Sequence, residues 1–203
     1  MNIYFLTLSS FFLISTVADA QSEGNFSVEA LNRRMISRRD TSCYFYAVRP
    51  EHPVKLKKEL TYFWYRPDTI LSTAGGYDGR LLDGVYKVFY PDKNLKEQGI
   101  FRTGLKTGEW KDWYEGGRLC RITHWDRGMK NGAFEEYSTD GKLVRKGKYK
   151  NNVLHGTLSE YDHDGRVHAS RYKNGVLRAD APVKKEKKKK TSKQIPAPDA
   201  QKH

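Results

Sequence analysis

Apolar positions over residues 84–178 recur with a period of 24 residues, without the three-to-four spacing of an amphipathic helix. Each unit opens on a glycine: Gly84, Gly108, Gly132 and Gly156. Two residues after the glycine stand Tyr86, Trp110, Phe134 and Leu158. Five residues after it stand Phe89, Trp113, Tyr137 and Tyr161. Self-similarity at a fixed period indicates a repeat architecture.

The second half of each unit has apolar columns of its own. Eleven residues after the glycine stand Leu95, Leu119, Leu143 and Val167. Seventeen residues after it stand Phe101, Trp125 and Tyr149, and Tyr172 fills this place one residue early. A turn rich in Gly and Asp separates the two halves, so each unit reads as a β-hairpin. We therefore predict an all-β fold, a single-layer antiparallel β-meander of repeated hairpins.

Strand geometry predicts how these columns face. On a flat strand, Trp110 and Trp113 point to opposite faces, because they are three residues apart. By the same rule Leu143, Gly147 and Tyr149 share one face. Equivalent residues of successive units lie two strands apart, or about 10 Å, so the rings should form ladders along the sheet.

The repeats are expected to span residues 60–180, with units beginning at 84, 108, 132 and 156. A degenerate unit, 60–83, precedes them and holds Tyr62 and Tyr65 in the early aromatic columns. Residues 21–59 form an N-terminal capping segment. In it, Phe26, Ala30, Leu31 and Met35 follow helical spacing and predict a short helix within 26–38, and residues 43–48 predict a strand.

Two stretches, QGIFRTGLKTGEWKDWY (98–114) and KGKYKNNVLHGTLSEY (146–161), resemble the MORN repeat. The spacing is similar to its bacterial variant branch, which includes YwqK-like proteins labelled as antitoxins. The resemblance covers residues 84–178 well. It implies a single-layer β-meander that acts as a scaffold or binding surface, and it brings no catalytic residues.

The chain begins with a candidate export signal. Residues 3–17 are an almost uninterrupted apolar run, followed by ADA at 18–20. This pattern predicts a secretory signal peptide, residues 1–20, with cleavage after Ala20; an uncleaved anchor is the alternative. We expect the mature protein to be periplasmic, outer-envelope or secreted.

The C-terminal segment is strongly basic. The chain carries a net charge of +13, and residues 181–203 hold eight lysines against Glu186 and Asp199. A like-charge run without core-forming residues predicts disorder. Its candidate role is a tether to anionic lipid or polysaccharide, and the alternative is a solvated tail that contributes only solubility. The candidate tether residues are Lys184, Lys185, Lys187, Lys188, Lys189, Lys190 and Lys193.

No constellation for catalysis, metal or cofactor binding emerges from the sequence. Cys43 and Cys120 allow one disulfide in an exported protein, and two free thiols are the alternative. The stretch SEYDHDGRVH (159–168) suggests a calcium loop, but it occupies the hairpin-turn slot of the fourth unit, where Asp and Gly favour a turn. His168 falls in a column with Lys96, Cys120 and Val144.

These features predict a non-enzymatic repeat protein of the bacterial cell envelope that binds or scaffolds another protein. Candidate partner contacts are Phe89, Trp113, Tyr137 and Tyr161, for which ordinary packing is the alternative. Two other functions stay open: association with an anionic surface through the basic tail, and neutralisation of a toxin. We expect no small-molecule substrate, and nucleic acid is the less favoured anionic partner.

Overall fold

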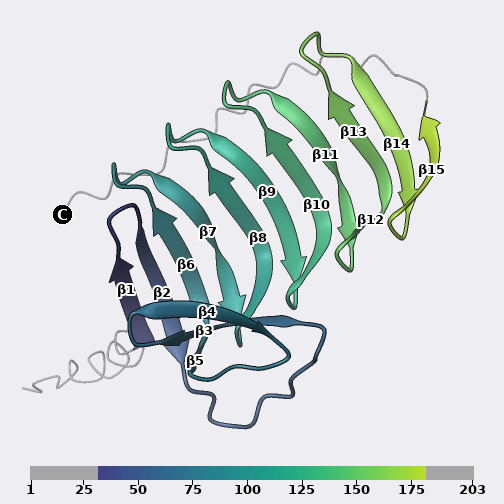
Figure 1. The fold of residues 1–203 in the computed structure, drawn as a ribbon. Helices are drawn as coiled ribbons and strands as arrows, with labels where there is room; N and C mark the ends of the chain where they lie inside the picture. The colour runs from purple at the N-terminus through teal and green to yellow at the C-terminus, as the bar shows by residue number, and fades with distance from the viewer. Residues whose placement is uncertain (1–31, 182–203) are drawn as a thin grey trace, which may run out of the picture. The chain divides into compact units, whose positions relative to one another are not determined.

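The computed structural model describes residues 32–181, whose elements are all strands of one antiparallel sheet (Figure 1). The first half contains β1 (Arg33–Ser37), β2 (Ser42–Val48), β3 (Thr61–Arg66), β4 (Thr69–Ala74), β5 (Arg80–Leu82), β6 (Gly84–Phe89), β7 (Leu95–Arg102) and β8 (Leu105–Trp113). The second half contains β9 (Leu119–Asp126), β10 (Met129–Tyr137), β11 (Leu143–Lys150), β12 (Val153–Leu154), β13 (Gly156–Tyr161), β14 (Val167–Lys173) and β15 (Val176–Ala181). The described strands from β2 onward belong to one compact unit.

The repeats form the meander that the sequence predicts. From β6 to β15 neighbouring strands follow chain order, with the two-residue β12 paired to β11 off the main path. Each turn after the first strand of a unit closes in the same way: in the second unit, Tyr114 N donates to Arg118 O and Gly117 N donates to Tyr114 O, both at 2.8 Å. The all-β, single-layer antiparallel fold is thereby confirmed.

Cross-strand pairs assign every side chain to one of two faces, since directly opposed residues point the same way. We call them the Trp110 face and the Trp113 face. Trp110 pairs with Thr123, and Trp113 pairs with Leu119. The two indoles therefore lie on opposite faces, as the spacing predicts.

Three hairpins carry an extra residue that flat-strand reasoning missed. The register shifts between Val88 and Phe89, between Asp112 and Trp113, and between Glu136 and Tyr137. The unopposed residues are Lys96, Cys120 and Val144. Such a β-bulge moves the following residue to the other face. The prediction for Leu143 was therefore wrong: it pairs with Tyr137 on the Trp113 face, whereas Gly147 pairs with Phe134 on the Trp110 face.

The fourth hairpin has no bulge, because β13 and β14 pair continuously from Gly156↔Tyr172 to Tyr161↔Val167. This missing residue explains why Tyr172 comes one position early in the repeat. It also corrects the column assigned to His168. That histidine is opposed to Glu160 rather than standing in the bulge position of Cys120.

The N-terminal strands depart from the predicted stack. β2 pairs with β6, so it occupies the place in front of Gly84 where residues 60–83 were expected. Those residues instead form β3, β4 and β5, and β3 follows β5 and β2 in the sheet order. The helix predicted within 26–38 is also wrong where the structure describes it. Residues 33–37 form β1, which pairs with β2, and residues 26–31 lie outside the described residues.

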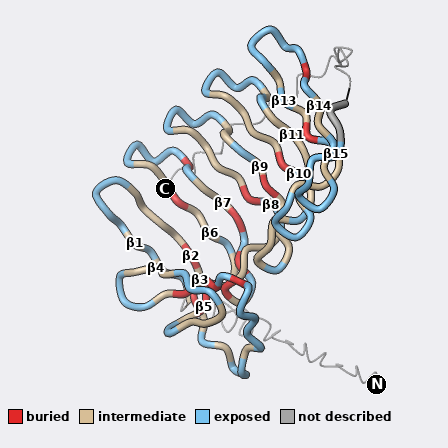
Figure 2. Tube along the Cα trace, turned by 45° about the vertical axis from the view of Figure 1, so that its right-hand side comes forward, coloured by how far each residue is buried: buried red, intermediate tan, exposed pale blue. Residues whose placement is uncertain are grey.

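The largest hydrophobic clusters lie around these N-terminal strands (Figure 2). One contains Phe45, Ala47, Leu82, Phe101 and Trp110. The other contains Leu60, Tyr62, Trp64 and Leu81. Phe101 and Trp110 come from β7 and β8, so this core anchors the beginning of the repeat stack.

Farther along, the sheet buries rings without a second layer. Phe134 is 1% exposed although it belongs to neither cluster. Its ring lies 4.6 Å from the ring of Tyr149, centroid to centroid, and over Gly147, where an added Cβ would approach Phe134 to 2.8 Å. Large residues on the first strand of a unit thus alternate with small ones on the second.

Candidate functional site

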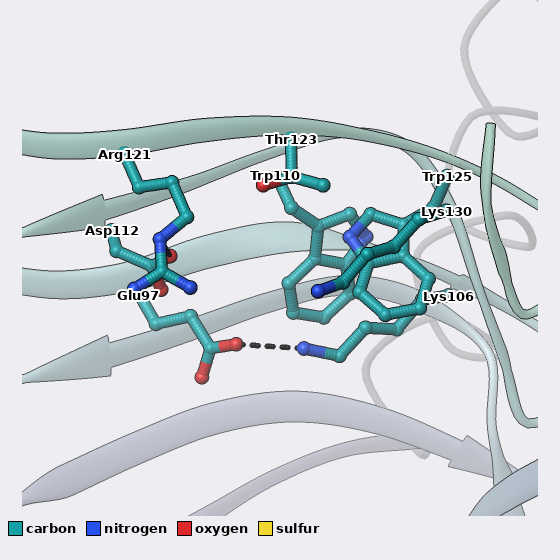
Figure 3. A pocket seen from close by; sticks show the side chains of 8 residues that line it. All are labelled: Glu97, Lys106, Trp110, Asp112, Arg121, Thr123, Trp125 and Lys130. Atoms are coloured by element: carbon teal, nitrogen blue, oxygen red, sulfur yellow. Dashed lines mark hydrogen bonds and ion pairs between the residues drawn. The ribbon is translucent and has the colours of Figure 1, made fainter. Parts of the chain in front are cut away.

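A hollow of about 320 Å3 opens on the Trp110 face between β7 and β10 (Figure 3). Four adjacent strands contribute its walls, two indoles lie at one end, and a group of charged side chains lies at the other (Figure 3). The lining residues are Glu97, Lys106, Trp110, Asp112, Arg121, Thr123, Trp125 and Lys130.

Lys106 joins the two ends of the hollow. Its Nζ donates to Glu97 Oε1 at 2.9 Å and lies 3.7 Å from the centroid of the Trp110 ring. It also lies 5.4 Å from the ring of Trp125. A cation over an indole face is attracted by the ring quadrupole, most strongly when water is partly excluded. The ammonium therefore ties the acidic end of the hollow to its aromatic end.

The same motif recurs one unit later. Lys130 Nζ lies 5.8 Å from the centroid of Trp125 and 5.1 Å from that of Tyr149. Lysines and aromatic rings thus alternate across β8, β9, β10 and β11 on the Trp110 face. This row was not predicted, although the sequence carries a signal for it: Lys106 and Lys130 are 24 residues apart.

A second row on this face consists of alternating charges. Arg121 lies 3.9 Å from Asp112 and 3.8 Å from Glu136, and Arg145 lies 3.8 Å from Glu136 and 3.4 Å from Glu160. These separations are nitrogen-to-oxygen distances between partly exposed groups, and ion pairs between exposed groups contribute little to stability individually. Their effect is to neutralise the cations of this face.

Asp112 has the least favourable electrostatic environment in the row, since it is directly opposed to another carboxylate, Glu97. Burial and then the charge of Glu97 raise the pKa of Asp112, and together they outweigh the nearby cations Arg121, Lys106 and Lys130. Like charges opposed across a strand pair are unfavourable. The hollow is therefore suited to holding polar or planar groups through rings and charges; its one hydroxyl, Thr123, is only 6% exposed.

The four predicted contact aromatics share the Trp113 face, and each is opposed to an aliphatic residue of the next strand. Phe89, Trp113, Tyr137 and Tyr161 are all half-buried. Phe89 stacks edge-on with Tyr44, at 5.6 Å between centroids, and Tyr137 donates a hydrogen bond to Glu135. Burial and then that hydrogen bond raise the pKa of Tyr137. The four rings therefore lie on one face as the sequence predicts, and their contact with a partner stays a prediction.

Two further tyrosines, each directly following a ladder residue in the sequence, link successive units. Tyr90 donates to the backbone carbonyl of Trp113 at 2.9 Å, and Tyr114 donates to that of Tyr137 at 2.7 Å. Each hydroxyl thus ties the end of one unit's first strand to the equivalent point of the next. The 24-residue spacing of Tyr90 and Tyr114 is a sequence signal for this link, which was not predicted.

Both cysteines are free thiols. Cys43 lies on β2 and Cys120 on β9, with β6, β7 and β8 between them in the sheet. Four strand spacings amount to about 19 Å, whereas bridged Cα atoms lie about 4.4–6.8 Å apart. A disulfide within one chain does not fit this sheet, which favours the alternative of two free thiols. Burial raises the pKa of the Cys43 thiol to about 11.

The stretch SEYDHDGRVH forms the hairpin turn between β13 and β14. Asp162 Oδ1 accepts from Arg166 N at 2.7 Å, and Gly165, at φ 75°, donates to Asp162 O. The aspartate thus bonds its own turn, as the repeat alignment predicts. In the part of the chain that the structure describes, no group of three or more His, Cys, Asp or Glu could hold a metal ion.

The predicted signal peptide, residues 1–20, and the candidate tether lysines between 184 and 193 lie outside the described residues. Among residues 32–181, no helix is long and apolar enough to cross a membrane.

Comparison with known families agrees with this repeat geometry. Residues 82–102 and 130–151 match the family model of the MORN repeat variant. The first match covers β6 and β7, and the second covers most of β10 and all of β11, so each contains strands of one hairpin. These matches support the MORN repeat family, whose members are repeat proteins that often bind or scaffold and are generally non-enzymatic. No curated protein matches the chain.

Proposed function

We propose that this chain is a non-enzymatic repeat platform that binds or scaffolds another protein at the bacterial cell envelope after export. The observation that carries the proposal is the open sheet: from β11 to β14, no other described element covers either face (Figures 1 and 2). Side chains recur along it at intervals of about 10 Å, two strands apart. A partner can therefore meet the same chemistry several times along one surface.

The aromatic ladder of the Trp113 face is the proposed contact surface. Its four rings are half-buried, so each presents part of its area while packing against an aliphatic neighbour. Aromatic residues are enriched among the residues that dominate binding energy at interfaces. The sites are Phe89, Trp113, Tyr137 and Tyr161.

Crosslinking in the native host followed by pull-down from envelope fractions tests this proposal. We expect a protein partner, whose capture falls when Trp113 and Tyr137 are both replaced by alanine. The matched control is Val85→Ala with Ile100→Ala, a pair of apolar residues on the same face that are 42% and 41% exposed. A protein recovered only as an uncrosslinked monomer would contradict the proposal.

The Lys-rich C-terminal segment supports a second candidate function, association with an anionic surface. Such an anchor is electrostatic, so about 1 M salt, where the Debye length is about 3 Å, should release the protein from membranes. Deleting residues 183–203 should have the same effect. A protein–protein platform should remain bound under both conditions.

The YwqK-like antitoxin branch would make the partner a toxin. That finer proposal requires a tight stoichiometric complex with one cognate protein, and a partner set of several unrelated proteins would argue against it.

A further inference from the structure

The cations of the two faces differ in their ion pairs, and the difference concerns the C-terminal half of the sheet, since Lys111 of the second unit lies on the Trp113 face and is paired with Glu109 at 2.7 Å. On the Trp110 face, Lys106, Arg121 and Arg145 each lie within 4.0 Å of a carboxylate. On the Trp113 face, the C-terminal half presents a group of exposed cations that form no ion pair with any residue the structure describes. They are Lys148 and Lys150 of β11 and Arg171 and Lys173 of β14.

Strand geometry sets these four cations in two parallel rows. Within each row, alternate residues of one strand lie about 6.8 Å apart. The rows are separated by the chain segment that contains β12 and β13, since Lys150 is opposed to Val153 of β12 and Arg171 to Thr157 of β13, so they lie two strand spacings, or about 10 Å, apart. Between them β13 presents short hydroxyl side chains, because Thr157 is opposed to Arg171 and Ser159 shares its face. We call Lys148, Lys150, Thr157, Arg171 and Lys173 the basic strip.

We propose that the basic strip binds an extended acidic segment of the partner protein. An extended peptide also repeats every two residues, about 6.8 Å, so carboxylates at alternate positions would face successive cations of a row. The hydroxyl of Thr157 offers a hydrogen bond to the same carboxylates. This inference rests on the proposed protein-binding function, and it specifies that the partner carries an extended acidic segment.

Two features favour a peptide over a membrane or an anionic polysaccharide. The cations are arranged in the two-residue period of an extended polypeptide, which neither lipid head groups nor sugar units share. The rows leave about 10 Å between them, the width of one extended chain with its side chains. Charge complementarity of this kind mainly selects the partner and speeds its association.

The test uses the full chain and fluorescent twelve-residue peptides. One alternates glutamate with serine, and the other has the same composition with its glutamates in adjacent pairs. We expect the alternating peptide to bind more tightly, and Lys148→Gln with Arg171→Gln to weaken it by at least about fivefold. The control is Lys87→Gln with Arg102→Gln, which removes the same charge from β6 and β7 on the same face, and it should change binding by less than about twofold.

Equal binding of the two peptides, no binding of either, or equal losses in the two double variants would overturn the proposal. So would tighter binding to phosphatidylglycerol vesicles or to a polyuronate that shows the same dependence on Lys148 and Arg171. Capture of the envelope partner distinguishes a failure of the basic strip from a failure of the proposed protein-binding function. If K148Q/R171Q captures it undiminished, the basic strip is wrong while the platform stands; if no variant captures a partner, the platform itself fails.

Discussion

Gly99 lies directly beneath the indole ring of Trp110: a Cβ added to Gly99 would stand 2.2 Å from two atoms of the ring. The same two positions 24 residues later hold Thr123 and Phe134, which are directly opposed, and 24 residues after that they hold Gly147 and Leu158, where a Cβ added to Gly147 would approach Leu158 to 3.3 Å. The alternation of small and large residues on neighbouring strands lets a single layer of β-sheet bury aromatic rings.

Gly99→Ala should therefore destabilise the fold by about 2 kcal/mol, because the methyl group must displace a ring that is itself packed on three sides. Urea unfolding measures the loss. Gly116→Ala is the matched control, since its Cβ would meet nothing within 4 Å, and it should be close to neutral. In a Trp110→Leu background the cost of Gly99→Ala should shrink; an undiminished cost would refute the steric explanation.

Two aspartates should affect stability with opposite signs as the pH changes. Burial and Glu97 raise the pKa of Asp112 above its ordinary value of 3.8, so the folded state binds this proton more tightly than the unfolded state. Its charge therefore costs stability once the pH rises above the raised value. Asp112→Asn should raise the free energy of unfolding at pH 7, by less than about 1 kcal/mol because the side chain is only partly buried, and the gain should vanish below about pH 4.

Asp140 provides the comparison. Hydrogen bonds from Ser138 and Lys142 lower the pKa of Asp140 to about 2. The charge of Asp140 therefore stabilises the fold at pH values above the pKa of the unfolded state, and this stabilisation is lost as the pH falls toward 2. Asp140→Asn should lower the urea midpoint at pH 7. Shifts of the same sign in the two variants would contradict these assignments.

The repeat period predicted the hairpins, their order and the opposed faces of Trp110 and Trp113, because one unit's pattern was checked by three others. It could not separate a bulge residue from an ordinary one. Cys120 occupies an ordinary column of the repeat alignment. Only the register with β8 shows that no residue of that strand is opposed to it. His168 was assigned to the wrong column for the same reason.

The N-terminal segment had no repeat to check it. Met35 follows helical spacing after Leu31, yet it stands on β1 with 58% of its surface exposed. Pairing with β2 overrides local periodicity there, and such pairing depends on residues distant in sequence. The hollow was not predicted, because the repeat columns were drawn from glycine and apolar positions and left out the 24-residue spacing of Lys106 and Lys130.

The thiol of Cys43 should react slowly in the folded protein. Burial raises its pKa to about 11, from an ordinary value of 9.0, and the hydroxyl of Tyr86 offsets this only in part. Because the thiolate is the reactive species, its fraction near neutral pH falls about a hundredfold. In Cys120→Ser, alkylation followed by mass spectrometry should be at least about tenfold slower in buffer than in urea. Equal rates would contradict the burial of this thiol.

The same experiment on the unmodified chain tests the free thiols. Without reductant, denatured protein should take up two labels, since the two cysteines are too far apart in the sheet to bridge within one chain. A mass that gains labels only after reduction would show a disulfide and overturn this reading.

The two tryptophans of the second unit should separate stability from binding. Trp110 is 3% exposed and packs against Phe101 and Tyr86, so Trp110→Ala should cost about 3–5 kcal/mol. Trp113 is half-buried on the other face, and Trp113→Ala should cost about 1 kcal/mol while reducing capture of the envelope partner. Urea unfolding and crosslinking yield, measured on both variants, make the comparison. If Trp113→Ala unfolds the protein as readily as Trp110→Ala and leaves capture by the folded fraction unchanged, the ladder is packing alone and the contact surface lies elsewhere.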